Sequence, residues 1–324
     1  MTTKRVLITG GAGFIGSALS TRLSSKGYQI RVLDDFSRSG VGGIDVSSEH
    51  IEIVSGDIRT PAICDMATSN VDIVFHLASI NGTKTFYSDP TAVLDVGARG
   101  IINIIDSCIK NNVKELLVAS SSEVYQTPPT FPTGEAVGLS IPDPLNPRSS
   151  YAGVKIFTEL MTINYGRQHF QRAIIFRPHN VFGKSMGWDH VIPELIRKIC
   201  DSKVFSSANH TSLEIQGSGD ETRAFVFIDD FIDGLELLLE RGEHMNIYNI
   251  GSREEISIAQ LADKIAKILG VKVKLKHGDL VDGSPKRRVP DISKLSALGY
   301  SPRWALDESL AVVCDWYEAQ VNQN

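Results

Sequence analysis

The chain has 324 residues, of which 42% are hydrophobic and 22% charged, and its 33 Lys and Arg against 38 Asp and Glu leave a net charge of −5. This composition is that of an ordinary globular protein and excludes a disordered or low-complexity chain. The mild negative charge argues against a nucleic-acid binder. Because the length exceeds the roughly 250 residues that one hydrophobic core usually organises, we expect a large domain with a smaller companion.

Neither a membrane segment nor a metal site is indicated. No apolar run approaches the roughly 20 residues of a membrane span, and the N-terminus lacks the apolar segment of a signal peptide. The four cysteines, Cys64, Cys108, Cys200 and Cys314, lack the paired spacing of a metal site or a disulfide framework. We therefore expect a cytoplasmic protein with reduced thiols and no metal, which binds neither nucleic acid nor membranes.

Short apolar runs alternate with longer amphipathic stretches through the first part of the chain. The runs are residues 6–8, 30–33, 51–54, 71–77, 116–119 and 173–176. The plausible helices between them include residues 14–25, 91–111 and 150–169. Continuous apolar runs are typical of strands buried on both faces, as in a parallel sheet covered by helices. The pattern predicts an α/β fold with a Rossmann-type doubly wound parallel sheet.

The regular alternation of predicted strands and helices ends after residue 183. Helical patterns then recur at residues 191–200, 231–240, 258–269 and 309–321, separated by irregular stretches and short strand candidates. We expect residues 1–183 to form the large domain. Residues 184–324 should form mainly a smaller, mixed α/β lobe, with segments that return to the large domain.

A glycine-rich turn follows the first predicted strand. Gly10, Gly13 and Gly16 allow a tight turn and let a pyrophosphate approach the N-terminus of the next helix. Asp34 ends the second strand, where a carboxylate accepts hydrogen bonds from the adenosine ribose and repels a 2′-phosphate. The pattern predicts a dinucleotide site that prefers NAD to NADP, although Arg38 nearby would soften the repulsion.

Further residues are expected to line this cofactor site. Asp57 and Ile58, after the third strand, are predicted to close over the adenine, with a simple turn as the alternative. Phe14, Ile15, Leu77 and Ala78 also belong to the predicted cofactor set, as do Tyr151, Lys155 and His179.

A loop with six prolines between residues 128 and 147 precedes the helix that carries Tyr151 and Lys155. The loop can be neither helix nor central strand, so it is either a stiff surface connection or a rigid support for the residues at its ends. The i, i+4 spacing places Tyr151 and Lys155 on one helix face. A nearby ammonium and a positive nicotinamide ring favour the phenolate, so this pair can take a proton from a sugar hydroxyl while hydride leaves the carbon.

Two polar residues follow the fifth predicted strand, at the edge where such sheets bind ligands. Ser121 can hydrogen-bond the same substrate hydroxyl, and Glu123 offers a second acid/base group beside it. The alternatives are a hydroxyl that caps backbone and a solvated turn residue.

Taken together, these motifs resemble those of an extended short-chain dehydrogenase/reductase of the NAD-dependent epimerase/dehydratase family. The resemblance rests on residues 10–16, 75–78, 120–125, Tyr151 with Lys155, residues 177–183, Arg223 through Asp230, and residues 287–291 and 298–300. It implies that bound NAD oxidises a nucleotide-diphosphate sugar, usually at C4, and that NADH commonly returns the hydride.

The resemblance also implies roles for single residues. Tyr151 would be the base, Lys155 its pKa partner and ribose anchor, and Ser121 the hydroxyl partner. The residues predicted to contact substrate are Ser79, Ser122, Asn180, Arg223 and one or both of Arg287 and Arg288. For the arginines a surface ion pair is the alternative. His179 is expected to touch the nicotinamide or the sugar, with a packed histidine as the alternative, and relatives often pair as homodimers through helices such as 91–111 and 150–169.

Several reactions fit this resemblance. The leading prediction is epimerisation or dehydration, with Glu123 active beyond the C4 step. The alternatives are decarboxylation of a nucleotide-linked uronic acid and a net oxidation that releases NADH. A non-catalytic dinucleotide-binding protein is the alternative outside enzymes. Residues 1–183 would hold NAD and the catalytic groups, and residues 184–324 mainly the nucleotide sugar.

Overall fold

A seven-stranded, fully parallel sheet is the centre of the molecule, with strand order β11-β6-β5-β4-β1-β2-β3. The computed structural model describes residues 4–38, 44, 48–205, 211–279, 283 and 285–322. The strands are β1 (Arg5–Thr9), β2 (Gln29–Asp34), β3 (Ile51–Ser55), β4 (Ile73–His76), β5 (Glu115–Ala119), β6 (Arg172–Pro178) and β11 (Asn246–Ile250). This order reverses beside β1, which places a ligand crevice at the carboxyl ends of the strands.

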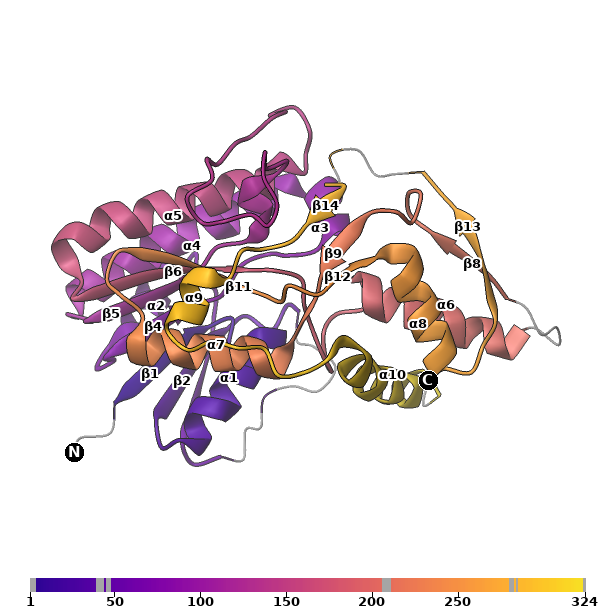
Figure 1. Ribbon diagram of the computed structural model, residues 1–324. Helices are drawn as coiled ribbons and strands as arrows, with labels where there is room; N and C mark the ends of the chain where they lie inside the picture. Colours follow the sequence, from indigo (N-terminus) through magenta and orange to yellow (C-terminus); the bar gives the residue numbers. More distant parts are fainter. Residues whose placement is uncertain are drawn as a thin grey trace.

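Helices cover both faces of this sheet, so the side chains of its inner strands are buried on both sides, whereas the edge strand β3 is only partly buried. In β1, Val6 and Ile8 belong to one core cluster and Leu7 to the other, as the two-residue period of a strand requires. Figure 1 shows α4 and α5 on one side of the sheet and α1 and α7 on the other. The helices of this domain are α1 (Phe14–Ser25), α2 (Pro61–Thr68), α3 (Thr83–Ser88), α4 (Pro90–Lys110), α5 (Ser149–His169), α7 (Ile228–Arg241) and α9 (Ser293–Ala297).

A smaller lobe lies beside the carboxyl ends of the strands (Figure 1). Its helices are α6 (Val191–Phe205), α8 (Ile258–Ile268) and α10 (Leu306–Val321). Its short strands are β7 (Val181–Phe182), β8 (Thr211–Ile215), β9 (Thr222–Ala224), β10 (Val226–Phe227), β12 (Glu255–Ser257), β13 (Val273–His277) and β14 (Arg287–Arg288). They form the pairs β10-β7 and β13-β8 and a three-stranded sheet, β12-β9-β14.

The predicted fold class is confirmed. All six strands expected from the sequence lie in the large sheet, and α1, α4 and α5 match the long helices that the sequence predicts. The seventh strand, β11, is not among the predicted strands; it pairs with β6 after a long excursion of the chain. The four cysteines are buried and free. Within the described ranges, no helix is both long and apolar enough to cross a membrane.

Candidate active site

The turn after β1 has the shape of a pyrophosphate cradle. Gly10 has a φ of +69°, and a Cβ there would lie 2.9 Å from the backbone of Ala78. A Cβ on Gly16 would lie 2.1 Å from the carbonyl oxygen of Gly10, so only glycine fits. Gly13 caps α1 without a side-chain hydrogen bond, and the first turn of α1 holds no acidic residue. Its N–H groups are thus left for an anion, which fits the dinucleotide that the sequence predicts.

Asp34 lies at the end of β2 beside this turn. Its Oδ2 accepts from the backbone N–H of Ala12 at 2.9 Å, and its Oδ1 accepts from that of Phe36 at 2.9 Å. Each carboxylate oxygen keeps a second acceptor site, so both ribose hydroxyls could still be bound. The guanidinium of Arg38 reaches away toward Gly82, where a Cβ would lie 3.4 Å from its Nη2.

The remaining predicted cofactor residues follow β3 and β4 or lie at the start of α1. The N–H groups of Leu77 and Ala78 both donate to the Thr9 hydroxyl at 3.2 Å, which fixes the loop after β4 against the glycine turn. Ile58 is buried, whereas Asp57 accepts hydrogen bonds from the Arg59 guanidinium at 2.6 Å and 2.9 Å. Phe14 and Ile15 open α1 and pack against the core.

Replacing Asp34 by Ala is expected to weaken NAD binding about tenfold, because charge-assisted hydrogen bonds of about 1.5–3 kcal/mol are lost. NADP binding should stay the same or improve, since the repulsion of a 2′-phosphate disappears. Titration with NADH and NADPH measures both effects. Asp35→Ala is the matched control, because the exposed Asp35 carboxylate bonds only Ser37 among the hydrogen bonds found in the described residues. Tighter NADPH than NADH binding by the unchanged chain would refute the role of Asp34.

Tyr151 and Lys155 lie one turn apart in α5, both buried. The phenol ring of Tyr151 stacks on Phe86 with ring centroids 4.5 Å apart, and the Ser121 hydroxyl lies within hydrogen-bonding reach of its oxygen. Nζ of Lys155 donates to the carbonyl of Ala119 at 2.9 Å and lies 5.8 Å from the Tyr151 ring centroid. The structure thus brings the predicted base, its cationic partner and the strand-end serine together.

Burial is the largest cause of the pKa shifts of Tyr151 and Lys155. It raises the pKa of Tyr151 to about 12, although the bond with Ser121 opposes the change. It lowers the pKa of Lys155 to about 8, and the charge of Glu159 opposes this fall. The phenol is therefore a poor base in the protein alone, and a positive nicotinamide nearby would supply the charge that favours the phenolate.

Glu123 lies between two arginines. It follows β5 in the 3-10 turn η1 (Ser122–Tyr125) and is 9% exposed. Its Oε1 lies 2.8 Å from Nη2 of Arg148, and Nη2 of Arg288 lies 2.9 Å from the same oxygen. Burial alone would raise the pKa of Glu123, but the charges of Arg288 and Arg148 outweigh it and hold this pKa below its usual range. Glu123 is therefore a carboxylate in the structure, and the two ends of the proline-rich loop meet in this ion pair.

The three-stranded sheet directs the candidate substrate arginines. Arg288 and Arg223 are paired in register on β14 and β9, so their side chains share the face toward Glu123. Arg287 points to the opposite face, where its guanidinium forms a two-point ion pair with Glu255 at 2.8 Å and lies 4.8 Å from the Phe131 ring centroid. The surface ion pair, one of the alternatives for these arginines, is thus the observed state of Arg287.

Arg223 and Asn180 are held by backbone carbonyls. Arg223 donates to the carbonyls of Thr222 and Pro285 at 2.7 Å and 2.6 Å, and burial lowers its pKa to about 10. Asn180, with a φ of 42°, donates to the Ala224 carbonyl at 2.9 Å. Ser122 is buried at the start of the 3-10 turn, and Ser79 follows β4.

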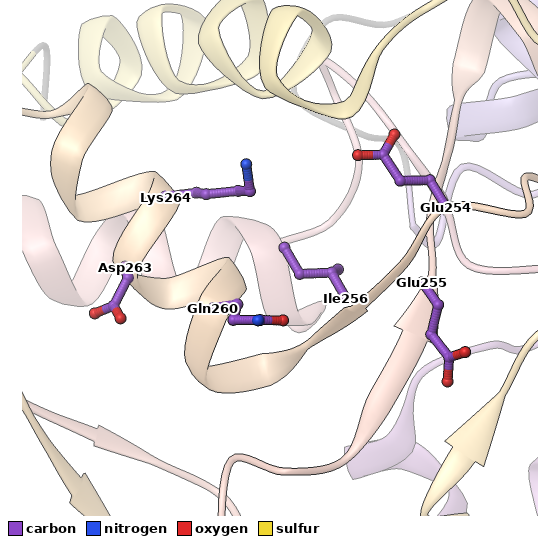
Figure 2. A pocket seen from close by; sticks show the side chains of 6 residues that line it. All are labelled: Glu254, Glu255, Ile256, Gln260, Asp263 and Lys264. Atoms are coloured by element: carbon purple, nitrogen blue, oxygen red, sulfur yellow. The ribbon is translucent and has the colours of Figure 1, made fainter.

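A surface pocket lies on another part of the smaller lobe. Figure 2 shows it between β12 and α8, with Glu255 at one edge. It is lined by Glu254, Glu255, Ile256, Gln260, Asp263 and Lys264. None of these residues belongs to the predicted cofactor or substrate sets, so the pocket is separate from the candidate active site. In the ranges that the structure describes, no group of His, Cys, Asp and Glu could hold a metal ion.

Several residues of the site were missed by sequence reasoning. Arg148 directly precedes α5 and completes the cluster around Glu123. Glu159, four residues after Lys155, is 3% exposed and pairs with Arg177 through two hydrogen bonds of 2.7 Å and 2.8 Å. Ser120 donates to the same carboxylate at 2.5 Å. The signal for Glu159 was its i, i+8 position relative to Tyr151, which continues the catalytic face of α5.

Comparison with known proteins agrees with this geometry. The model of the NAD dependent epimerase/dehydratase family matches residues 6–251. The chain therefore belongs to that family and is an NAD-dependent enzyme, as its motifs predicted.

Three known proteins are similar to this chain over almost its whole length. UDP-glucuronic acid decarboxylase 1 of Xenopus tropicalis is 29% identical over 321 residues, which cover 98% of this chain and 73% of the relative. An epimerase of Methanothermobacter thermautotrophicus superposes with a TM-score of 0.88 at 26% identity, covering 99% of this chain and 95% of the other. The protein MoeE5, solved with UDP-glucuronic acid and NAD, gives a TM-score of 0.82 at 25% identity, covering 98% and 99%.

Proposed function

We propose that the protein acts on a nucleotide-diphosphate-linked uronic acid, oxidising C4 with bound NAD and releasing the carboxyl group as CO2. The observation that carries this proposal is the cluster of Arg148, Arg288 and nearby Arg223 around the single carboxylate of Glu123. Such a buried surplus of positive charge needs a further anion. Among the described residues, Nε of Arg148 finds no hydrogen-bond partner, and Nη2 of Arg288 has its ion pair with Glu123 but no well-aligned hydrogen bond. A sugar carboxylate, in addition to the diphosphate, would satisfy them.

The catalytic residues have positions suited to the first step. When bound, NAD supplies the acceptor for the hydride that leaves C4. Tyr151 takes the proton of the C4 hydroxyl, Ser121 hydrogen-bonds the same oxygen, and the ammonium of Lys155 stabilises the phenolate. Burial of Tyr151 against Phe86 keeps water from the phenol.

The C4 ketone turns the neighbouring carboxylate into a β-keto acid. The C5–C6 bond then breaks, CO2 leaves, and the electron pair passes to the enolate of the ketone. C5 would next take a proton from water, and Tyr151 would give its proton back to the C4 oxygen as the bound reduced cofactor supplied the hydride to C4. Arg148 and Arg288 would orient the carboxylate for this step. The curated decarboxylases similar to this chain support the assignment.

Water loss fits the cluster less well, because elimination needs a proton donor for the departing hydroxyl. Glu123 is held as a carboxylate between two guanidinium groups, with a lowered pKa. A hydroxyl such as that of Ser122 is a far weaker acid. Epimerisation is the second candidate, supported by the similarity to an epimerase at 26% identity and by the fact that it requires only the C4 step.

Incubation of the NAD-loaded protein with UDP-glucuronic acid, UDP-glucose and dTDP-glucose tests the proposal. Mass spectrometry separates the reactions, since decarboxylation loses CO2, dehydration loses water and epimerisation leaves the mass unchanged. We expect loss of CO2 from UDP-glucuronic acid. An unchanged mass with an inverted sugar would favour the second candidate, and no reaction or binding with any sugar nucleotide would refute the substrate class.

Arg288 and Arg287 provide a matched pair of variants. Arg288→Met should lower kcat/KM for UDP-glucuronic acid about 100-fold, because one partner of a buried charge cluster is lost. Arg287→Met should change it little, since Arg287 lies on the opposite face of the strand. Steady-state kinetics of both variants measure the difference. Equal losses would contradict the assignment of Arg288 to the substrate.

We further propose a homodimer. Leu94 and Ile102 on α4 and Leu160 on α5 are exposed by 45%, 37% and 55%. The two helices pack on each other and carry these apolar residues outward, a pattern typical of helix-mediated pairing. Sedimentation should give the mass of two chains, and Leu160→Asp should shift the equilibrium toward one, because a charge would be buried in the interface. A single-chain mass for the unchanged protein would contradict the proposal.

We also propose that the two parts of the chain bind different ligands. Residues 1–183 would bind NAD and carry Tyr151 and Lys155, whereas residues 184–324 would mainly bind the nucleotide sugar through Arg223 and Arg288, with α7 and β11 returning to the large domain. A cytoplasmic location is supported by the four free cysteines, since oxidising compartments favour disulfides.

A further inference from the structure

The side-chain amide of Asn249, at the carboxyl end of β11, has one orientation only. Its Nδ2 donates to the carbonyls of Thr133 and Asp291 at 2.9 Å and 3.1 Å. Its Oδ1 accepts from the hydroxyl of Tyr125 at 2.8 Å, and that hydroxyl itself accepts from Nη1 of Arg177 at 2.7 Å. The two carbonyls can only accept, so Nδ2 of Asn249 must face them, and the guanidinium of Arg177 can only donate, so the Tyr125 hydroxyl gives its own hydrogen to Oδ1. Oδ1 of Asn249 is therefore an acceptor toward every neighbour.

This orientation fixes the tautomer of His179. Nε2 of His179 lies 3.1 Å from Oδ1 of Asn249, so Nε2 must carry the hydrogen. A second proton on the ring is disfavoured, since burial and the charges of Arg288 and Arg177 lower the pKa of His179 to about 3. Nδ1 is therefore a bare acceptor at any physiological pH.

That acceptor has no partner in the part of the chain that the structure describes. His179 is 1% exposed, and its Nδ1 makes no hydrogen bond to any residue that the structure describes. Its backbone N–H donates to the Ile250 carbonyl at 3.0 Å, and a Cβ on Gly251 would lie only 2.9 Å from the His179 Cβ, so the backbone around His179 is closely packed. A buried acceptor without a donor costs about 1–3 kcal/mol, which a ligand could recover.

We infer that Nδ1 of His179 accepts a hydrogen bond from a hydroxyl of the nucleotide-linked sugar, which makes His179 a specificity-determining residue. The inference rests on the proposed function. Its support is position: His179 and Pro290 lie together beside Gly251, Pro290 is two residues after Arg288, and the Arg288 guanidinium faces Glu123 and the proposed sugar site. A bare acceptor selects for a hydrogen-bond donor and rejects a sugar that lacks one.

Two substitutions of His179 test the roles of its two ring nitrogens, Nδ1 and Nε2, separately. His179→Gln can keep the bond to Asn249, because its amide reaches the place of Nε2, but it loses the acceptor at Nδ1. His179→Asn can place an oxygen near Nδ1 and loses the bond to Asn249. Calorimetry on NAD-loaded protein compares UDP, UDP-glucuronic acid and UDP-glucose, together with 2-fluoro and 3-fluoro analogues of UDP-glucose, in which fluorine replaces a hydroxyl that could donate.

We expect His179→Gln to bind UDP and NAD as the unchanged protein does and to bind its preferred nucleotide sugar about tenfold more weakly. His179→Asn should retain most of that affinity. One fluoro analogue should bind the unchanged protein more weakly than the parent sugar, and His179→Gln should no longer distinguish the two. The thermal midpoint of His179→Gln should not fall, since no internal hydrogen bond of Nδ1 is lost.

The outcomes distinguish the two proposals. If no nucleotide sugar binds better than UDP to the unchanged protein, both the proposed function and this inference fail. If one does bind better and His179→Gln keeps the whole advantage, or loses UDP or NAD affinity equally, only the role of His179 is overturned.

Discussion

Replacement of Tyr151 by Phe is expected to lower kcat about 1,000-fold, because the group that receives the C4 hydroxyl proton is removed while the ring remains. Stacking on Phe86 should survive, so the fold and the NAD affinity should change little. Formation of reduced cofactor in a single turnover, together with the rate of product release, measures the loss at the oxidation step.

Tyr165→Phe is the matched control for this experiment. Tyr165 lies on the same helix, where it packs against the core beside His169, and it is distant in sequence from every predicted site residue of α5. Its replacement should leave kcat within about twofold, as the loss of a hydroxyl outside the site does not alter the transition state. Turnover by Tyr151→Phe at the rate of the unchanged protein would overturn Tyr151 as the base.

The largest expected loss of stability follows from replacing Arg177 by Met. Arg177 and Glu159 are 2% and 3% exposed, so the variant would leave the Glu159 charge buried. Among the described residues, the Ser120 hydroxyl would still donate to it, and Lys155 lies farther away. Breaking a buried pair in this way costs about 3–5 kcal/mol. Urea unfolding followed by circular dichroism should show the lower free energy of unfolding.

Two further variants identify the cause of that loss. Arg287→Met breaks an exposed pair with Glu255 and should destabilise the protein far less. Arg177→Met combined with Glu159→Leu should recover much of the stability, because no charge is then left buried. A combined variant no more stable than Arg177→Met alone would show that packing, and not the unpaired carboxylate, causes the effect.

The large sheet could be predicted from the sequence because burial on both faces leaves a local record. Residues 73–75 and 116–119 are runs of apolar residues, and the helices between such strands show their own period. The strand β11 leaves a weaker record, since its five residues mix polar and apolar side chains without a regular two-residue period. Its place beside β6 depends on a chain excursion of more than sixty residues, which no local pattern encodes.

In the candidate site, too, the local features could be predicted from the sequence and the contacts between distant residues could not. The glycine turn and the Tyr151–Lys155 spacing are local, so the sequence predicts both. The partners of Glu123 come from the residue directly before α5 and from β14, and no spacing in the sequence relates them to Glu123. Arg287 and Arg288 are equivalent in sequence, and only the pairing of β14 with β9 decides which one faces Glu123.

The position of β11 at the edge of the sheet also limits which segments could be exchanged with a relative to make a chimeric protein. β6 is covered on one side by β5 and on the other by β11, which the chain reaches only after building most of the strands of the smaller lobe. A fragment that ended at residue 183 would expose the backbone groups of β6 to other chains, a common cause of aggregation. A chimera with a new substrate lobe must therefore keep α7 and β11 from the cofactor domain's own sequence, and graft only the segments that precede and follow them.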